Sequence, residues 1–327
     1  METEPAVMHI PVLLDEVVAT LRPSFADVAH PRVLDCTLGL GGHALALAQA
    51  GAAVTGIDRD AAARGFALER FERAGCGKHL TVIAATFADA VENLVSSGQR
   101  FTGVLADLGV SSLQLDRPER GFSWRSDDVA PDMRMGDGCP ESALDLMERL
   151  SDEELADIIF RYGEERLSRR VAKAIKKALA AGALKTNADL ADVVRAAIPG
   201  HHPRHPAMRT FQALRIAVND ELGQLERLLK ALPKLVEPGG RVAIISFHSL
   251  EDRAVKQSLR SGLQDGTWED VARKVITASE AEQTANPRSS PAKLRWAVRA
   301  HPDQESAPDS AHGSTRPTRT PPPYFPL

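Results

Sequence analysis

Residues 33–58 contain the pattern that most constrains the fold of this chain. A short apolar stretch ends in Asp35, a glycine-rich turn follows at residues 39–43, and an alanine-rich helix start comes next. A second apolar stretch then ends in Asp58. A strand, a glycine turn, a helix and a strand-terminal acid are typical of a parallel α/β sheet that binds a nucleoside cofactor. Glycine lets a ligand approach the backbone, and the second acid can accept hydrogen bonds from ribose hydroxyls.

The same pattern leaves two cofactor classes open. The residues from Gly39 to Ala44 fit G-x-G-x-x-A, which an NAD site also tolerates. Asp35 lies directly before the glycines, where a carboxylate would repel a pyrophosphate but attract the ammonium and sulfonium charges of S-adenosylmethionine (AdoMet). Nearby, His43 is the one side chain suited to a phosphate. We therefore favour AdoMet over NAD.

Composition bounds the class of protein. The chain has 327 residues, 43% of them hydrophobic and 26% charged, which is ordinary for a globular protein of about two domains. No apolar run is long enough to span a bilayer, and the acidic N-terminus does not look like a signal peptide. Three cysteines, far apart, form neither a disulfide framework nor a metal-binding spacing. We expect a cytoplasmic protein without a membrane partner.

Five short apolar stretches predict strands, at residues 32–36, 53–58, 79–84, 101–107 and 241–247. Helical stretches between the first four predict a doubly wound, mostly parallel α/β sheet. Residues 108–240 separate the last two strands, far more than a crossover needs. We therefore expect core segments at 1–112 and 209–300, an all-helical insert at 113–208, and a proline-rich, disordered tail at 301–327.

Inside the insert, capping signals predict separate helices. Ser151 with Glu154 forms a capping box, and Thr186 can cap a later helix. A long helix with apolar residues from Phe211 to Leu229 is expected to leave the insert and pack on the sheet. Residues 161–215 carry twelve Lys/Arg and four Asp/Glu. Such an excess suits an RNA- or DNA-binding surface, and a solvated helix face is the alternative.

Polar and aromatic side chains follow the predicted strands. Asp107 ends the fourth strand, so with Asp35 and Asp58 it should lie on the ligand-binding edge of a parallel sheet, unless it only caps a helix. Phe87 can stack on an adenine or belong to the core. His248 can act as a base, bind substrate or be structural. The histidines at 201–205 have no carboxylate or thiol close in sequence, so we expect no metal.

The motifs together resemble one family, the bacterial small-subunit rRNA cytosine-N4 methyltransferases. The matching stretches lie in order at residues 9–16, 38–43, 57–60, 107–116, 119–123, 132–135, 162–166, 209–216 and 246–253. The resemblance implies a class I (Rossmann-like) methyltransferase with an inserted helical domain. It also implies methylation of the exocyclic N4 of a decoding-region cytidine in 16S rRNA, the partner being the small ribosomal subunit.

Carried onto this sequence, the resemblance implies a set of cofactor contacts: Gly41, Gly42, His43, Asp58, Phe87, Asp107 and Gln114. We expect Asp107 to reach the N4 hydrogens as well, and His248 to contact substrate. Arg209, Arg215 and the basic helix at 165–179 are expected to bind RNA phosphates. The sequence leaves open whether the protein forms a homodimer. The alternatives are a related methyltransferase acting on DNA or protein, an NAD-dependent oxidoreductase, or a non-catalytic RNA-binding factor.

Overall fold

The computed structural model describes residues 10–26, 28–136, 138–203 and 205–301, so most of the expected tail lies outside the described residues. Its centre is a seven-stranded sheet in the order β3-β2-β1-β4-β5-β7-β6, in which only β7 runs antiparallel to its neighbours. The strands are β1 (Arg32–Asp35), β2 (Ala53–Ile57), β3 (Leu80–Ile83), β4 (Phe101–Asp107), β5 (Val236–Ser246), β6 (Trp268–Val271) and β7 (Lys293–Arg299). The predicted α/β fold class is confirmed.

Helices cover both faces of the sheet because successive strand residues alternate between two apolar clusters. On one face pack α1 (Leu14–Leu21), α2 (Gly42–Gln49) and α3 (Ala61–Arg73). On the other pack α4 (Phe87–Ser96), α11 (Glu221–Leu235) and α12 (Ser249–Gln264). Side-chain caps start several of them, with Asp60 accepting from the N–H of Ala62 and Thr86 from that of Asp89. These helices bury the sheet on both sides.

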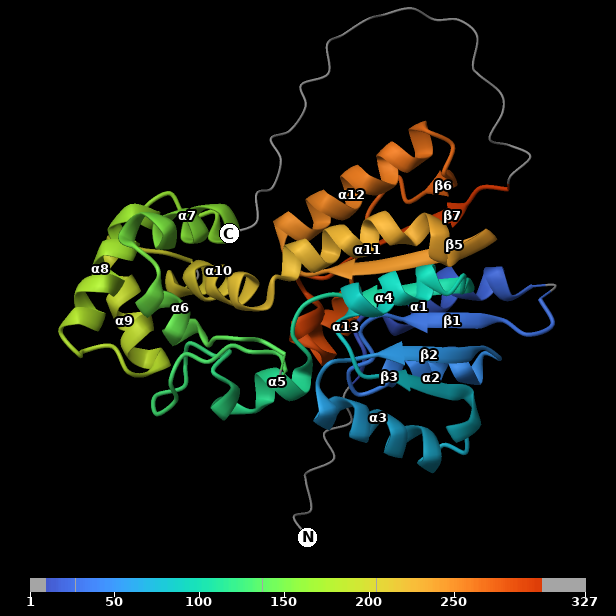
Figure 1. Ribbon diagram of the computed structural model, residues 1–327, viewed down its shortest axis with the longest axis horizontal. Coiled ribbons are helices and arrows are strands. Elements are labelled where there is room, and N and C mark those ends of the chain that lie inside the picture. Colours follow the sequence, from blue (N-terminus) through green and yellow to red (C-terminus); the bar gives the residue numbers. More distant parts are fainter. Residues whose placement is uncertain (1–9, 27, 137, 204, 302–327) are drawn as a thin grey trace, which may run out of the picture.

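A third apolar cluster, built from residues between Met133 and Val218, forms a separate helical layer beside the sheet (Figure 1). It contains α6 (Ala143–Arg149), α7 (Asp152–Gly163), α8 (Ser168–Ala180), α9 (Asn187–Ala197) and α10 (Ala207–Asn219). The predicted caps at Ser151 and Thr186 are both present. We call these five helices and the loop before them the helical insert.

The single long helix expected from Phe211 to Leu229 is two helices. Asp220 has a left-handed φ of 48°, which ends α10 and starts α11 in a new direction. α10 packs in the cluster of the insert, whereas α11 packs on the sheet. This packing favours Asp220, rather than the expected boundary at residues 208 and 209, as the junction between insert and core.

The C-terminal part of the sheet differs most from the prediction. β6 and β7 were not expected, and β5 begins at Val236 rather than at Arg241. Between Val236 and Arg241, β5 advances five residues while β4 advances two, so residues 238–240 form a bulge within the strand. The remaining short elements are α5 (Ser112–Asp116), α13 (Glu280–Ala285) and the 3₁₀ helices Arg22–Phe25, Gly77–His79, Pro118–Arg120 and Pro287–Ser289. Among the described residues, no helix is both long and apolar enough to cross a bilayer.

Candidate active site

Close packing behind the glycine turn shapes the start of α2. Gly41 has a φ of +73°, and a Cβ there would lie 3.0 Å from the Cβ of Ala67. A Cβ on Gly42 would lie 2.4 Å from Cγ of Pro11, so neither position has room for a side chain. Gly42 lines a cavity, whereas Gly41 supports the turn from behind. The turn therefore brings bare backbone to the cavity wall.

Asp58, directly after β2, holds this turn to the sheet. Its Oδ2 accepts a hydrogen bond from the N–H of Gly39 at 2.9 Å, and its Oδ1 accepts one from the N–H of Asp60 at 2.8 Å. Burial raises the pKa of Asp58, and these two hydrogen bonds oppose the rise. The carboxylate lines the cavity, and each of its oxygens can accept a further hydrogen bond. This geometry suits the ribose-binding role that we predict for Asp58.

Asp35 lies behind the cavity wall rather than on it. The residue is 2% exposed, and its Oδ1 accepts a hydrogen bond from the N–H of Thr37 at 3.1 Å. Cys36 and Thr37 line the cavity, but Asp35 does not. Burial raises the pKa of Asp35 to about 7, and the charge of Asp58 adds to the rise. Asp35 therefore lies on the expected edge of the sheet, as the last residue of β1, but its side chain does not line the cavity.

Asp107, the last residue of β4, presents an unsatisfied acceptor. Its Oδ1 is buried and has no hydrogen-bond partner in the described part of the chain. Its Oδ2 lies 3.6 Å from Nδ1 of His43, whose Nε2 is 2.9 Å from the carbonyl oxygen of Val12. Burial and the charges of Asp35 and Glu251 raise the pKa of Asp107 well above its ordinary value. A cation or an N–H donor bound beside Asp107 would stabilise its charged form.

A cavity of about 540 Å³ joins these elements between the carboxyl ends of the parallel strands and the helical insert. The sheet order arranges Phe87, Asp58, the glycine turn, Asp107 and Phe247 along one edge, after β3, β2, β1, β4 and β5 respectively. The predicted cofactor contacts that line the cavity are Gly42, His43, Asp58, Phe87, Asp107 and Gln114. A ligand lying along this edge would meet aromatic, acidic and backbone groups in turn.

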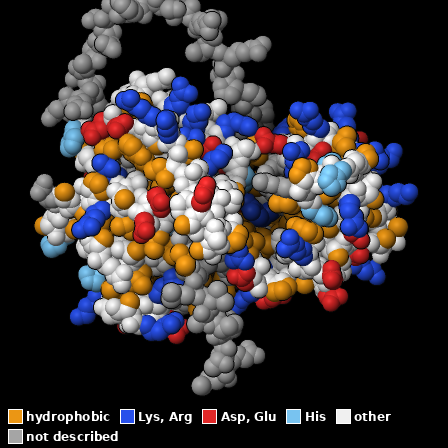
Figure 2. Space-filling view, turned by 180° about the vertical axis from the view of Figure 1, so that it is seen from behind, with side chains coloured by type: hydrophobic (Ala, Val, Ile, Leu, Met, Phe, Trp, Pro, Cys, Tyr) orange, Lys and Arg blue, Asp and Glu red, His pale blue; other side chains and the backbone are white. Residues whose placement is uncertain are grey.

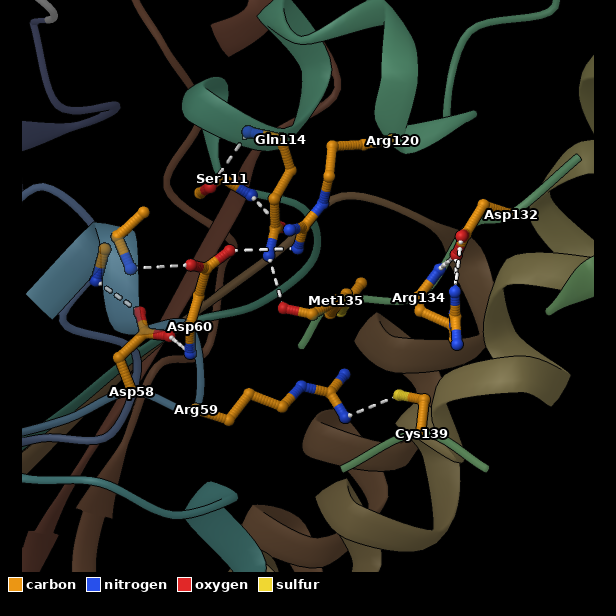
Figure 3. Close-up of polar contacts among 12 residues, drawn as sticks. Asp58, Arg59, Asp60, Ser111, Gln114, Arg120, Asp132, Arg134, Met135 and Cys139 are labelled. Atoms are coloured by element: carbon orange, nitrogen blue, oxygen red, sulfur yellow. Dashed lines mark hydrogen bonds and ion pairs between the residues drawn. The ribbon is translucent and has the colours of Figure 1, made fainter. Parts of the chain in front are cut away.

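Gln114 lines the cavity, but its amide is committed to the surrounding loop. Its Nε2 donates to the carbonyl oxygen of Met135 at 3.0 Å, and its Oε1 accepts from the N–H of Ser111 at 3.0 Å. The second bond belongs to the capping box of α5. Gln114 therefore fixes the start of the helical insert against the cavity (Figure 3). These bonds use one N–H of Nε2 and one lone pair of Oε1, so a second N–H and a second lone pair are left for a contact to a cofactor.

Two charged residues beside Asp58 bind the helical insert to the sheet (Figure 3). Asp60 pairs with Arg120, with 2.9 Å between Oδ2 and Nη2. Arg59 donates to Oδ1 of Asn219 at 2.9 Å and to Sγ of Cys139 at 3.3 Å. These contacts were not predicted, because nothing in a single sequence pairs Arg59 with a residue 160 positions away. The bond to Asn219 joins this edge of the sheet to the turn between α10 and α11.

His248, after β5, is the N-terminal cap of α12. Its Nδ1 accepts a hydrogen bond from the N–H of Glu251 at 3.4 Å, and its Nε2 lies 3.2 Å from Oε1 of the same residue. The side chain is 8% exposed. Glu251 lines the cavity, and His248 does not. Of the three roles left open for His248, this geometry supports the structural one, and it brings forward a carboxylate that the sequence analysis missed.

Arg215 faces the cavity rather than the outer surface of the insert. Its Nε and Nη2 donate to the two carboxylate oxygens of Glu221 at 2.7 and 2.8 Å, and the two side chains are 18% and 10% exposed. The break at Asp220 turns α11 so that Glu221 comes to lie beside Arg215. The phosphate contact expected of Arg215 does not fit this position, because an RNA backbone binds at the surface.

The other basic residues of the insert divide between solvent and structure. Lys173 and Lys177 of α8 are exposed, as is Arg209, whose Nη1 lies 3.6 Å from a carboxylate oxygen of Glu165. Lys176 differs, because its Nζ donates to the carbonyl oxygens of Met147, Glu148 and Leu150 at the end of α6. Figure 2 shows Lys and Arg side chains dispersed over the insert among hydrophobic and some acidic ones. Part of the excess of positive side chains in residues 161–215 therefore makes contacts within the protein and is not available at the surface.

Comparison with known proteins decides the family. Residues 6–300 match the MraW methylase family. The chain belongs to this family. It is 50% identical over 295 residues to the ribosomal RNA small subunit methyltransferase H of Sorangium cellulosum (strain So ce56), covering 89% of this chain and 90% of that protein. The proteins of the same name from Gloeobacter violaceus and Deinococcus deserti are each 46% identical, over 303 and 300 residues, with coverage of 91% of this chain and 90% and 95% of theirs.

The match to the MraW methylase family spans every element that lines the cavity and the whole helical insert. The family therefore covers both the glycine turn, which the sequence revealed, and the Arg215–Glu221 pair, which it did not. Residues 302–327 lie beyond the matched region and outside the described residues. The candidate site thus belongs entirely to the family domain.

Proposed function

We propose that this protein methylates the exocyclic N4 of a cytidine in the decoding region of 16S rRNA, within the small ribosomal subunit. As a member of the MraW methylase family, it is a methyltransferase whose methyl donor is AdoMet. The observation that carries the proposal is the buried, unpartnered Oδ1 of Asp107 on the wall of a cavity at the strand ends. The small-subunit rRNA methyltransferases among its relatives support an RNA acceptor.

The residues along the cavity fit a cationic nucleoside. Phe87 offers a ring to an adenine, Asp58 offers two acceptors to ribose hydroxyls, and Gly42 exposes backbone to the methionine end. Asp107 supplies an acceptor that nothing in the described protein satisfies. AdoMet, when bound, supplies a methyl group activated by a positively charged sulfur. Asp35, buried behind the wall with a pKa of about 7, adds negative potential on the same side of the cavity when it loses its proton.

The sheet order predicts where the methyl acceptor binds. In this proposal the methyl donor lies along Phe87 after β3, Asp58 after β2 and the glycine turn after β1. The methyl acceptor then binds in the remaining space beyond β4 and β5, where Asp107 and Phe247 lie. In the proposed transfer, the N4 lone pair would form the new N–C bond as the C–S bond of the donor breaks, with the bonding electrons staying on sulfur and the released N4 proton passing to water. In this proposal Asp107 accepts a hydrogen bond from N4 and so orients this weak nucleophile.

The outer surface of the helical insert is the proposed RNA-binding region. Lys173 and Lys177 on α8 and Arg209 on α10 are exposed, and a phosphate backbone would pair with them. They lie in the same packed layer as Met208, which lines the cavity. An RNA strand lying on the insert would thus pass the cavity opening, where one base can leave the stack.

The proposal is tested with tritiated AdoMet and small ribosomal subunits purified from cells that lack this protein. We expect label to enter the subunits as N4-methylcytidine, with a single modified nucleotide found by mass spectrometry of the digested rRNA. Duplex DNA should stay unlabelled. Label at another atom, in ribosomal protein or in DNA would contradict the proposed acceptor.

A further inference from the structure

We infer that Arg215, held by Glu221, reads the target cytosine through its N3 and O2 atoms. This inference rests on the proposed function and names its base-selecting residue. Arg215 and Glu221 line the same cavity as Asp107 and Glu251. Asp107 ends β4, Glu251 follows β5, and Arg215 on α10 lines the same cavity from the side of the helical insert.

The Arg215 side chain is prepared for recognition by its partner. Burial acts to lower the pKa of Arg215, but the adjacent carboxylates of Glu221 and Glu251 raise it, so the guanidinium stays charged. Glu221 takes Nε and Nη2 in a bidentate pair and fixes the plane of the group. Nη1 has no hydrogen-bond partner within the described ranges, and it is not among their fully enclosed polar atoms. The Nη1 side of the Arg215 guanidinium is therefore held in a fixed orientation, and no described residue accepts its hydrogen bonds.

Glu251, another acid in this part of the cavity, already accepts hydrogen bonds from the protein. Oε2 of Glu251 accepts from the backbone N–H groups of Phe247 and His248 at 2.9 and 3.3 Å. Burial would raise the pKa of Glu251, but hydrogen bonding to His248 and the charges of His248 and Arg215 hold it below its ordinary value. An ionised, internally bonded Glu251 leaves Asp107 as the open acceptor and Arg215 as the open donor.

Cytosine matches this pair of groups better than the other bases do. Its edge presents the N4 amino donor next to the N3 and O2 acceptors. The amino group would meet Oδ1 of Asp107 while N3 and O2 meet the guanidinium of Arg215. Uracil would bring O4 towards Asp107 and an N3–H towards Arg215, so both contacts become repulsive. Adenine keeps an amino group and one ring acceptor but has a C–H in place of O2, and it is larger.

A phosphate or the carboxylate of the donor is a weaker candidate for Arg215. Arg215 and Glu221 together carry no net charge, so they attract an anion much less than a free arginine does. The chain has exposed arginines for phosphates, such as Arg209. The glycine turn, which faces the methionine end of the donor, follows β1 rather than β5. The neutral, oriented pair is suited to an uncharged base edge.

The test compares three variants of the full-length protein. The double variant Arg215→Gln/Glu221→Gln replaces the ion pair with two amides of similar size, which avoids leaving a buried glutamate unpaired. Arg215→Lys keeps the charge but not the planar donor edge. Arg149→Gln is the control, because Arg149 at the end of α6 also forms a bidentate pair, with Glu141 before that helix, and neither residue lines the cavity. Each is assayed on subunits with cytidine, uridine or adenosine at the target position.

We expect both Arg215 variants to lower kcat on cytidine about 10- to 100-fold, the value of a bidentate base contact, and to narrow the preference for cytidine over adenosine. Their AdoMet Kd, measured by calorimetry, should stay within about twofold of wild type, and Arg149→Gln should match wild type throughout. A parallel loss of AdoMet affinity and activity, or full activity with unchanged base preference, would overturn the inference. Should the double variant fail to fold, Arg215→Lys decides by the same readouts. If wild type itself left cytosine N4 unmodified, the proposed function would fail instead.

Discussion

The strand-end half of the cavity and the basic helical insert show two ways in which a sequence encodes a site. At the strand ends, Gly42, Asp58 and Asp107 hold their positions because the local backbone puts them there: a turn without room for a Cβ, and acids at the ends of adjacent strands. In the insert, the number of cations predicts a surface but not which of them reach it. Lys176 caps α6, and Arg215 turns into the cavity.

This difference shows that residues positioned by local backbone geometry are easier to predict from a sequence than the partners of charged side chains. A glycine or a strand-end acid is fixed by its neighbours within a few residues, whereas a cation on a long side chain is assigned by whatever partner lies nearest after folding. Substitutions in the strand-end half should have larger effects on activity than substitutions of cations in the insert.

Asp107→Asn should give the largest loss of activity. The amide keeps the size of the side chain but removes the charge that faces donor and acceptor, so we expect kcat to fall about 10²- to 10³-fold and AdoMet affinity about tenfold. The free energy of unfolding should not fall, because the change relieves repulsion from Asp35 and Glu251. Single-turnover methylation and calorimetry measure these effects, with exposed Asp157→Asn as control. Near-normal catalysis with unchanged AdoMet binding would remove Asp107 from the site.

Asp35→Asn should change how stability depends on pH. Because the folded-state pKa of Asp35 is about 7 against an ordinary value of 3.8, the folded protein keeps a proton that the unfolded chain loses. Wild-type stability from this group therefore falls as pH rises from about 4 to about 7, by up to about 4 kcal/mol. The variant should lose this slope and be the more stable protein above pH 7. Denaturant unfolding of both proteins across this range measures it; parallel curves would contradict the buried-acid interpretation.

Gly42→Ala should displace the turn against Pro11 and weaken AdoMet binding about tenfold, or roughly 1.4 kcal/mol. Its matched control is Gly65→Ala in α3, where a new Cβ would have no atom within 4 Å. That change should instead stabilise the protein by about 0.5–1 kcal/mol, because alanine restricts the unfolded chain. Equal effects of the two substitutions on AdoMet Kd would show that the turn does not approach the donor.

The same difference between local geometry and charge explains which parts of the fold and of the site could be predicted from the sequence. β1 to β4 were predicted to within about one residue because each is a short apolar run with a turn or cap beside it. β6 and β7 were missed because Trp268–Val271 is half charged and Lys293–Arg299 interleaves cations with apolar residues. Only strand pairing reveals them, β7 with β5 and β6 with β7. In the site, the acids were visible, but the roles of Glu251 and Arg215 depend on the turn at Asp220.

Charge reversal on α8 should separate surface cations from structural ones. For subunit binding, log K falls as log salt rises. The double variant Lys173→Glu/Lys177→Glu should make this negative slope shallower by roughly 1.5, since each phosphate contact contributes about 0.7–0.9. Lys176→Met should leave that slope unchanged but lower the free energy of unfolding by about 1–3 kcal/mol, because three carbonyl oxygens lose their donor. Filter binding over a salt series and denaturant unfolding distinguish them. Equal slopes for all three proteins would place the RNA elsewhere.

The central claim is that raised-pKa acids at the strand ends receive a cationic methyl donor. Calorimetry of AdoMet binding near pH 7, in buffers that differ in ionisation enthalpy, tests it most directly. We predict that binding releases protons, because the donor's charge lowers the pKa of Asp107 and Asp35, and that Asp107→Asn reduces the release. A binding heat independent of the buffer, with the same affinity in Asp107→Asn, would contradict it.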